Sequence, residues 1–350
     1  MISITTVYLA LAVAMPQDST SGFVKQDSSP AFAKQQPTPL KPYTLAVIGD
    51  TPYGPVKTEE FPRLIALING NSSVDVVVHL GDIKLGTNSP CTNEYYATVR
   101  AWFDSFNAPL VYTPGDNEWA DCHTYIKRNG LFTPTERLQE LRTEFFPVAG
   151  LTLGDRKMQV RSQASDTAYR AYVENVLWVA SNVVFATLNV PGSNDDLEPW
   201  GAQLPANAKN YPSQLDERAT RGRANSAWLT EVFATATAQS AAGVVLMFQA
   251  DLWDQTAEVH GYGALVRQLA TLAGAFKKPV LYLEGDSHRF RVDQPFMADS
   301  GFRKMFKAVP AAPNVTRIVV EGANGRTEYL RLTVDPTGPE LFTWERVPLE

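Results

Sequence analysis

The chain is poor in cysteine, in histidine and in net positive charge. Its 350 residues include two cysteines and four histidines, and 31 basic residues against 37 acidic ones leave a net charge of −6. A protein that binds a nucleic-acid backbone needs a basic face, so this balance argues against a nucleic-acid partner. A small nucleotide-like or other phosphorylated ligand remains compatible with it, because bound metal ions can supply positive charge that the side chains lack.

A long apolar run is also missing. The longest, from Ile2 to Met15, has about fourteen residues, too few to cross a bilayer as a helix. Its length fits the apolar core of a signal peptide, and it contains two Ala-x-Ala sequences, although no basic residue precedes Lys25. We therefore expect residues 1–41 to be a signal-like segment and a flexible Ser-, Gln- and Pro-rich leader, the chain to be exported, and residues 42–350 to form one domain.

The two cysteines, Cys91 and Cys122, allow two interpretations. In an exported protein an isolated pair is expected to form a disulfide. That bond would close a loop of about thirty residues and stabilise the fold by roughly 3–4 kcal/mol in the chain-entropy model. The alternative is a pair of unrelated buried thiols.

Short β-branched runs alternate with longer helix-like segments from Tyr43 onward. Hydrophobic residues make up 44% of the chain, enough for a large core. Continuous apolar runs of this length are typical of strands buried on both faces, and their alternation with helices predicts a mostly parallel sheet. The predicted strands are 45–48, 74–80, 110–113, 183–190, 243–248 and 279–283, and the predicted helices are 59–69, 93–106, 135–146, 224–238 and 263–276.

After Asn314 the pattern changes to shorter strands separated by turn residues. We expect residues 316–320, 329–334 and 341–344 to be antiparallel and to form a second sheet packed on the first. Two long polar stretches, 150–168 and 191–214, are expected to be insertions near the mouth of a site.

Gly-Asp pairs are more frequent than chance. A random order of this composition would contain about one, whereas the chain has five, and four of them follow predicted strands and end in Asp50, Asp82, Asp116 and Asp286. A single pair is explained by a glycine turn and an aspartate helix cap. Parallel strands, however, bring their carboxyl ends to one edge of a sheet. Four carboxylates there repel one another unless they are protonated or neutralised, and such oxygen-rich clusters hold hard divalent cations.

Together with their order along residues 43–346, these motifs resemble the calcineurin-like metallophosphoesterase superfamily, in a divergent, histidine-poor form. The resemblance implies a four-layer αββα sandwich of two mixed sheets with two divalent metal ions. Gln249 stands in the place of a lone family histidine. The other family motifs take the forms Asp50-Thr51-Pro52, Gly81-Asp82-Ile83-Lys84, Gly115-Asp116-Asn117-Glu118 and Gly285-Asp286-Ser287-His288.

The resemblance also implies a set of metal ligands. They are Asp50 and His288 for one ion, Asp116, Asp286 and Gln249 for the other, and Asp82 as the bridge between them. Asp251 is the alternative to Gln249 and otherwise an outer carboxylate, a role also expected of Glu118. Because only one of five motif histidines is kept and oxygen donors replace the others, Mg, Mn or Ca is favoured over Zn or Fe. Pro52 stands where the family has a further histidine ligand, so the first metal site is expected to be weaker.

The catalytic group of the family is altered as well. Asn117 stands where the family has a catalytic histidine, and an amide donates hydrogen bonds but does not transfer protons. His123 and Lys84 are the candidates to assist it. The alternatives are that His123 is a surface-loop residue and that Lys84 forms a structural salt bridge. We expect Tyr53 to be a packing residue.

The resemblance implies hydrolysis of a phosphate ester, with attack by a hydroxide that bridges the two metals. The residues do not distinguish a phosphatase from a phosphodiesterase. The alternative is a non-catalytic metal- or ligand-binding module on the same fold, favoured by the missing histidines and opposed by the retention of all four strand-end aspartates. The expected partner is a small phosphorylated substrate, with no membrane span.

Overall fold

The computed structural model describes residues 40–86, 89–125, 132–201, 204–207, 212–323 and 325–350. The predicted signal-like segment and nearly all of the predicted leader lie outside these residues, so the boundary at residue 41 stays a prediction. Within the described part, no helix is both long enough and apolar enough to cross a membrane.

The first sheet has five strands in the order β12-β11-β1-β2-β3. Its centre is parallel, because β2 pairs with both β1 and β3 in the same direction, while β11 and β12 add antiparallel strands at one side. The strands are β1 (Tyr43–Ile48), β2 (Val76–His79), β3 (Leu110–Tyr112), β11 (Glu328–Val334) and β12 (Phe342–Pro348).

The second sheet has seven strands in the order β4-β5-β6-β7-β8-β10-β9. The four strands β6, β7, β8 and β10 are parallel, and the remaining three are antiparallel additions at the edges. The strands are β4 (Arg161–Ser162), β5 (Val176–Ala180), β6 (Val183–Thr187), β7 (Gly243–Met247), β8 (Val280–Glu284), β9 (Arg291–Asp293) and β10 (Val315–Val319).

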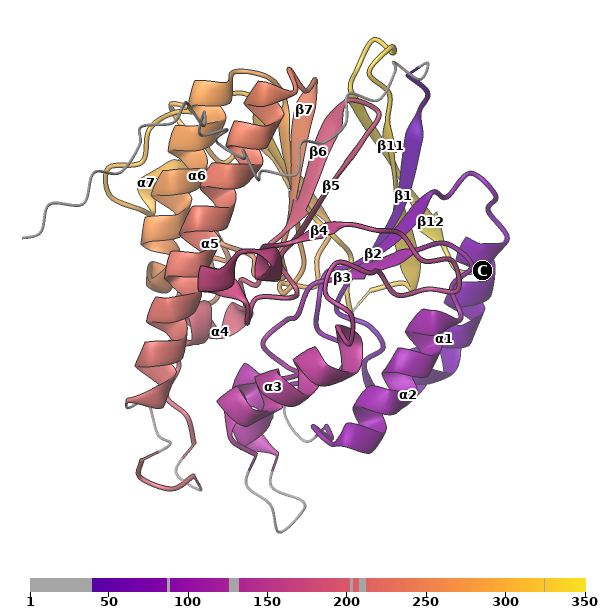
Figure 1. Ribbon diagram of the computed structural model, residues 1–350, viewed down its shortest axis with the longest axis vertical. Helices are drawn as coiled ribbons and strands as arrows, with labels where there is room; N and C mark the ends of the chain where they lie inside the picture. The colour runs from indigo at the N-terminus through magenta and orange to yellow at the C-terminus, as the bar shows by residue number, and fades with distance from the viewer. Residues whose placement is uncertain (1–39, 87–88, 126–131, 202–203, 208–211, 324) are drawn as a thin grey trace, which may run out of the picture. The chain divides into compact units, whose positions relative to one another are not determined.

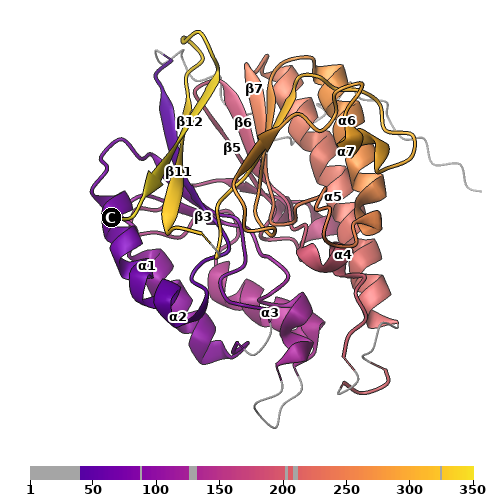
Figure 2. The ribbon, with the colours of Figure 1, turned by 180° about the vertical axis from the view of Figure 1, so that it is seen from behind.

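The helices cover the outer faces of the two sheets, so the described residues form four layers (Figures 1 and 2). Helices α1 and α2 pack on the first sheet, and α5 and α6 pack on the second. The helices are α1 (Gly54–Asn69), α2 (Asn93–Asp104), α3 (Pro134–Phe145), α4 (Gly192–Asp196), α5 (Ser213–Ala238), α6 (Gly263–Phe276) and α7 (Gly301–Lys304), with 3-10 turns η1 (Ala120–Thr124), η2 (Gln163–Ser165), η3 (Thr167–Tyr169) and η4 (His260–Tyr262).

The continuous apolar strands are explained by burial on both faces. In β1, Leu45 and Val47 point between the sheets, whereas Ala46 and Ile48 pack with the helices outside. Successive side chains of a strand point to opposite faces, so a strand in the middle of four layers needs apolar residues at every position. The predicted αββα architecture is confirmed.

The prediction for the last three strands is wrong in one respect. They do not form a sheet of their own: β10 lies parallel to β8 in the second sheet, and β11 and β12 extend the first sheet beside β1. The difference follows burial, because β10 is buried along most of its length, while β11 alternates and β12 is largely exposed. Strand β5, which pairs with β6, is not among the strands predicted from the sequence.

Candidate metal centre

The four strand-end aspartates meet at the ends of β1, β2, β3 and β8. With His288 they form two triads that share Asp82, and within each triad one ligand atom per residue lies within 4.8 Å of the others. The first triad is Asp50, Asp82 and His288, and the second triad is Asp82, Asp116 and Asp286. Asp50 is completely buried and Asp82 is 2% exposed. Each of these triads could hold a divalent cation, because oxygen-rich clusters are what such ions require.

The backbone at these residues is unusual. Asp50, Asp82, Asp286 and His288 have φ angles of 50°, 58°, 71° and 58°, in the left-handed region that residues other than glycine rarely adopt. Each such residue costs of order 1–3 kcal/mol and persists only where its surroundings hold it. Strain of this kind clusters at functional sites, and here it falls on four of the five residues of the two triads.

Glycine before these aspartates allows close approach as well as a turn. A Cβ atom at Gly115 would lie 2.0 Å from Asp82 Oδ1, and one at Gly285 would lie 2.8 Å from Asp50 Oδ2. Neither position has room for a side chain. The Gly-Asp pair therefore places one carboxylate and at the same time makes space for the carboxylate of another strand.

Glu118 ties the ends of β2 and β3 together beneath the centre. Its Oε1 accepts hydrogen bonds from the Asp82 N–H (3.1 Å), the Gly115 N–H (2.7 Å) and Tyr112 Oη (2.6 Å). The side chain is completely buried. These bonds hold the backbone that carries two of the aspartates, and the outer role of Glu118 stays a prediction.

Tyr53 is a site residue that sequence reasoning missed. Its Oη donates to Asp82 Oδ2 at 2.6 Å, and Asn117 Nδ2 donates to the same carboxylate oxygen at 2.7 Å and also contacts Tyr53 Oη. The Tyr53 ring meets the His288 ring edge-on, with centroids 5.2 Å apart. The sequence feature that could have identified Tyr53 is its position directly after the motif Asp50-Thr51-Pro52.

Burial raises the pKa values of all four aspartates. It raises the pKa of Asp50 to about 8 and that of Asp116 to about 6, and it raises the pKa values of Asp82 and Asp286 well above the ordinary range, with the neighbouring carboxylates adding to the effect. Among the described residues, no lysine or arginine pairs with any of the four.

The donor set fits two divalent ions. Four charged carboxylates carry four negative charges, which two divalent cations balance. Asp116 Oδ1 is buried without a hydrogen-bond partner in the described structure, which is the state expected of a ligand atom.

Lys84 and His123 both form hydrogen bonds with backbone groups of loops near the centre. The buried Lys84 ammonium donates to the carbonyl oxygens of Asn117 (2.7 Å), Leu85 (2.9 Å) and Gly86 (3.3 Å), and burial lowers its pKa to about 8. His123 Nδ1 accepts from the Gly201 N–H at 2.8 Å, and burial lowers its pKa to about 4. Both side chains hold loops around the motif Gly115-Asp116-Asn117-Glu118.

Gln249 and Asp251 also have structural partners. Gln249 Oε1 accepts from the Gly192 N–H at 2.5 Å, while its Nε2 is buried without a partner among the described residues. The Asp251 carboxylate accepts from Arg317 at 2.6 Å, and its backbone N–H donates to Asp286 Oδ2 at 3.2 Å. The geometry favours an outer role for Asp251 and the support of α4 for Gln249.

Cys91 and Cys122 form a disulfide, with their Cα atoms 5.8 Å apart. It lies next to the motif Gly115-Asp116-Asn117-Glu118, because the two sulfurs are 3.8 and 3.7 Å from the carbonyl oxygen of Asn117. Lys84 donates to that same carbonyl. The cross-link therefore anchors the segment that carries Asp116.

The turn α4 covers the other side of the second triad. Ser193 Oγ lies 2.7 Å from Asp116 Oδ2 and 2.9 Å from Asp121 Oδ1. A cavity of about 190 Å³ opens beside it, lined by acidic side chains that include Asp116, Asp286 and Glu198. The sequence placed the stretch 191–214 near the mouth of a site without identifying Ser193.

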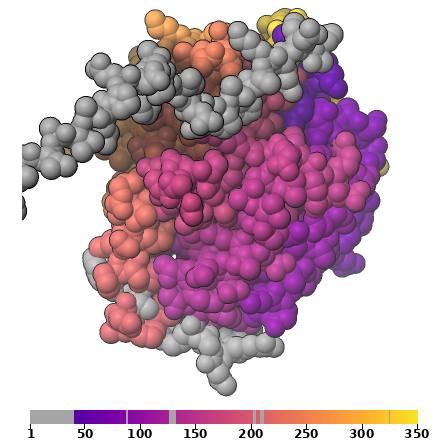
Figure 3. Space-filling model, in the orientation of Figure 1, coloured from indigo at the N-terminus to yellow at the C-terminus, as the bar shows by residue number. Residues whose placement is uncertain are grey.

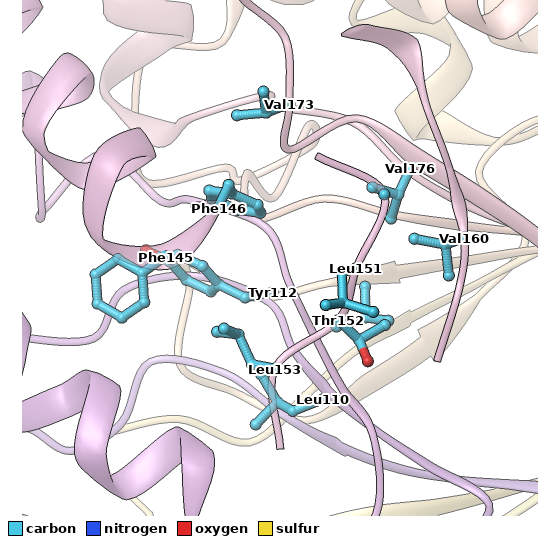
Figure 4. Close-up of a pocket in the computed structure, with 12 residues that line it drawn as sticks. Leu110, Tyr112, Phe145, Phe146, Leu151, Thr152, Leu153, Val160, Val173 and Val176 are labelled. Carbon is cyan, nitrogen blue, oxygen red and sulfur yellow. The ribbon is translucent and has the colours of Figure 1, made fainter. Parts of the chain in front are cut away.

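A second cavity lies away from the centre, between β3, the end of α3 and the stretch around Leu151 (Figure 4). Its volume is about 20 Å³, and its lining is mostly aliphatic and aromatic. On the face of the molecule seen in Figure 3, the magenta part of the chain covers much of the middle. A small apolar cavity of this kind is a packing defect and offers no group for chemistry.

Residues 43–203 match the family model of the calcineurin-like phosphoesterases. Among solved structures, the chain is similar to a dimetal phosphatase from Danio rerio, at 13% identity and a TM-score of 0.53, over 88% of this chain and 99% of that one. It is also similar to GAP50, described as the anchor in the inner membrane complex of Plasmodium, at 9% identity and a TM-score of 0.45, over 88% of this chain and 89% of that one. No curated protein matches the chain. The predicted resemblance is confirmed.

Proposed function

We propose that the calcineurin-like phosphoesterase domain of this chain uses two divalent metal ions to hydrolyse phosphate esters. The observation that supports it most is the pair of triads joined through Asp82, each with two buried aspartates. A single structural ion would need only one of them. A protein released from catalysis has little physical reason to crowd four carboxylates around two adjacent positions.

Each ion has its own side chains in this proposal. Asp50 and His288 would hold the first ion, Asp116 and Asp286 the second, and Asp82 both. Five of these six contacts, with Asp82 counted twice, are carboxylate oxygens, so Mg, Mn or Ca is favoured over Zn or Fe. The ions would lower the pKa of attacking water and offset charge on the phosphoryl oxygens.

The protein's own groups orient this centre rather than transfer protons. Tyr53 and Asn117 donate hydrogen bonds to Asp82 and so set the direction of the shared carboxylate. Asn117 cannot protonate a leaving group, and the Lys84 ammonium is occupied by backbone carbonyls. We therefore expect a preference for esters with acidic leaving groups, such as aryl phosphates, which depart without general-acid help.

We also propose that the protein is exported to an oxidising compartment, secreted or periplasmic. The disulfide between Cys91 and Cys122 supports this, because such bonds persist mainly in oxidising compartments. N-terminal sequencing of the protein recovered from its host tests it: a new N-terminus within the first 41 residues is expected. An uncut, intracellular chain with free thiols would contradict it.

The central experiment measures bound metal and turnover on the same preparation. Purified full-length protein is analysed for metal content, then assayed on aryl phosphate monoesters and diesters with Mn²⁺, Mg²⁺ or Ca²⁺ and with chelator. Two ions per chain and chelator-sensitive turnover are expected. Asp155→Asn is the matched control, because Gly154-Asp155 is the same dipeptide in an exposed loop.

The rival function, a non-catalytic metal- or ligand-binding module, predicts a different result. It is favoured by the position of Asn117, which replaces the family's catalytic histidine. Bound metal with no turnover on any of these esters, in wild type and in Asp155→Asn alike, would support the binding module and contradict the proposed enzymatic function.

A further inference from the structure

The turn α4 has a backbone conformation that is rare outside glycine. Ser193, Asn194, Asp195 and Asp196 have consecutive φ angles of 48°, 59°, 62° and 60°, all left-handed. Left-handed geometry costs roughly 1–2 kcal/mol per residue for most amino acids, and asparagine and aspartate tolerate it best. Three of the four residues are therefore suited to the turn, and Ser193 is the exception.

Groups from three other parts of the chain hold the turn in this shape. Arg221 and Arg218 of α5 pair with the Asp195 carboxylate at 2.5 and 3.0 Å. The Gly261 N–H donates to Asn194 Oδ1 at 2.7 Å, and the Gly192 N–H donates to Gln249 Oε1 at 2.5 Å. Strained backbone persists where its surroundings hold it this firmly.

The held turn faces the second triad. Ser193 Oγ is 2.7 Å from Asp116 Oδ2, and a Cβ atom at Gly192 would lie 2.8 Å from both Asp116 Oδ2 and Asp286 Oδ1. The hydrogen bonds described for Ser193 Oγ go to Asp116 and Asp121, and none goes to Asp50 or His288. The backbone thus closes one side of the second triad and leaves only a hydroxyl to contact its carboxylate.

We propose that Ser193 is a positioning residue for the second metal ion, and that the strained turn exists to deliver its hydroxyl to Asp116. The proposal rests on the dinuclear function proposed above. With one carboxylate oxygen held by the hydroxyl, the other oxygen, Asp116 Oδ1, is directed to the ion. Loss of an outer-shell partner of this type typically weakens metal binding by about 10–100-fold, and here the loss should fall on the second ion alone.

The competing explanation is that Ser193 merely fills the turn, and two substitutions separate the explanations. Ser193→Gly removes the hydroxyl and relieves the left-handed strain, so it should leave the Tm equal or higher while it weakens the second ion. Ser193→Thr keeps the hydroxyl but places a β-branched residue at positive φ, so it should lower the Tm while second-ion affinity is retained.

The test is a calorimetric titration of the metal-stripped full-length chain with Mn²⁺, with a thermal unfolding scan of each preparation. His288→Ala and Asp286→Asn identify which binding step belongs to which triad. The expected result is a 10–100-fold weaker second step for Ser193→Gly, an unchanged first step, and wild-type affinities for Ser193→Thr.

Two outcomes would overturn the inference, and they differ in meaning. If wild type binds two ions and Ser193→Gly binds both with wild-type affinity, Ser193 has no positioning role although the dinuclear function stands. If wild type takes up fewer than two Mn²⁺ ions, the dinuclear function fails and this inference fails with it.

Discussion

The two triads of the centre are supported in different ways. The first triad lies against Tyr53, whose ring meets His288 and whose hydroxyl meets Asp82, and Tyr53 is only three residues from Asp50. The second triad is supported by Ser193, which is 77 residues from Asp116 in the chain, and by a disulfide beneath Asn117. The residues of both triads are far apart in the chain. The support of the first triad comes from a residue close to its Asp50, whereas the support of the second comes from a remote segment.

The largest expected effect comes from the residue that the halves share. Asp82→Asn removes one negative charge from both triads, so we expect both binding steps to weaken and turnover to fall by about 1,000-fold, equivalent to ~4 kcal/mol. Metal titration and aryl phosphate assays measure the two effects. Turnover equal to that of Asp155→Asn would show that the triads are not the reaction centre.

Removal of the disulfide should affect the second half more than the first. The double variant Cys91→Ala with Cys122→Ala is expected to lose roughly 3–4 kcal/mol of unfolding free energy, because its unfolded chain is no longer closed into a loop of about thirty residues. Since the sulfurs lie under the segment that carries Asp116, the second Mn²⁺ step should weaken more than the first. Denaturant unfolding with and without reductant measures the stability. A reductant effect in the double variant would show that the disulfide is not its cause.

Both halves should make the metal-free protein less stable as the pH rises. The folded-state pKa of Asp50 is about 8 against an ordinary value of 3.8, so between these values the folded state holds a proton that the unfolded chain has released. Stability therefore falls with rising pH and levels off above pH 8. The lowered pKa values of His79 and His123, about 4, oppose this trend only up to about pH 6.5, and that of Lys84 acts only above pH 8.

Between pH 6.5 and 8 we expect the free energy of unfolding to fall by about 1–2 kcal/mol through Asp50. Asp82 and Asp286 act in the same direction, whereas Asp116, with a pKa of about 6, acts mainly below this range. Denaturant unfolding of chelator-treated protein across this range measures it. The slope should shrink in Asp50→Asn and remain in Asp155→Asn, and stabilisation by Mn²⁺ should grow with pH. If the free energy of unfolding did not change with pH, the aspartates of the centre would not hold extra protons in the folded state.

The smallest expected effect concerns the support of the first half. Tyr53→Phe removes one hydrogen bond to Asp82 and keeps the ring against His288, so we expect metal affinity and turnover to fall by about 10-fold. Tyr172→Phe is the control, a buried tyrosine that packs against Arg142 outside the centre. Equal behaviour of the two variants would make Tyr53 the packing residue that the sequence predicted.

Sequence reasoning reached the carboxylates because their positions repeat. Asp50, Asp82, Asp116 and Asp286 each follow a glycine at the end of an apolar strand, and parallel strands bring such ends together. The same reasoning could not identify the partners of Lys84, for which the sequence predicts either a role in assisting Asn117 or a structural salt bridge. Its ammonium is used by backbone carbonyls, and backbone partners leave no trace in the pattern of side chains.

The sequence alone predicted an α/β fold, the four strand-end carboxylates and a need for divalent cations, because apolar periodicity and repeated local motifs carry that information. The αββα arrangement was implied by the family resemblance, and a disulfide was one of two interpretations of Cys91 and Cys122. Only the tertiary structure decided that Tyr53 reaches Asp82, that Gln249 supports α4, and that Ser193 reaches Asp116 from a left-handed turn. Those contacts join residues 29, 57 and 77 positions apart. Distance along the chain says nothing about direction in space, which the packing of the two sheets and their loops sets.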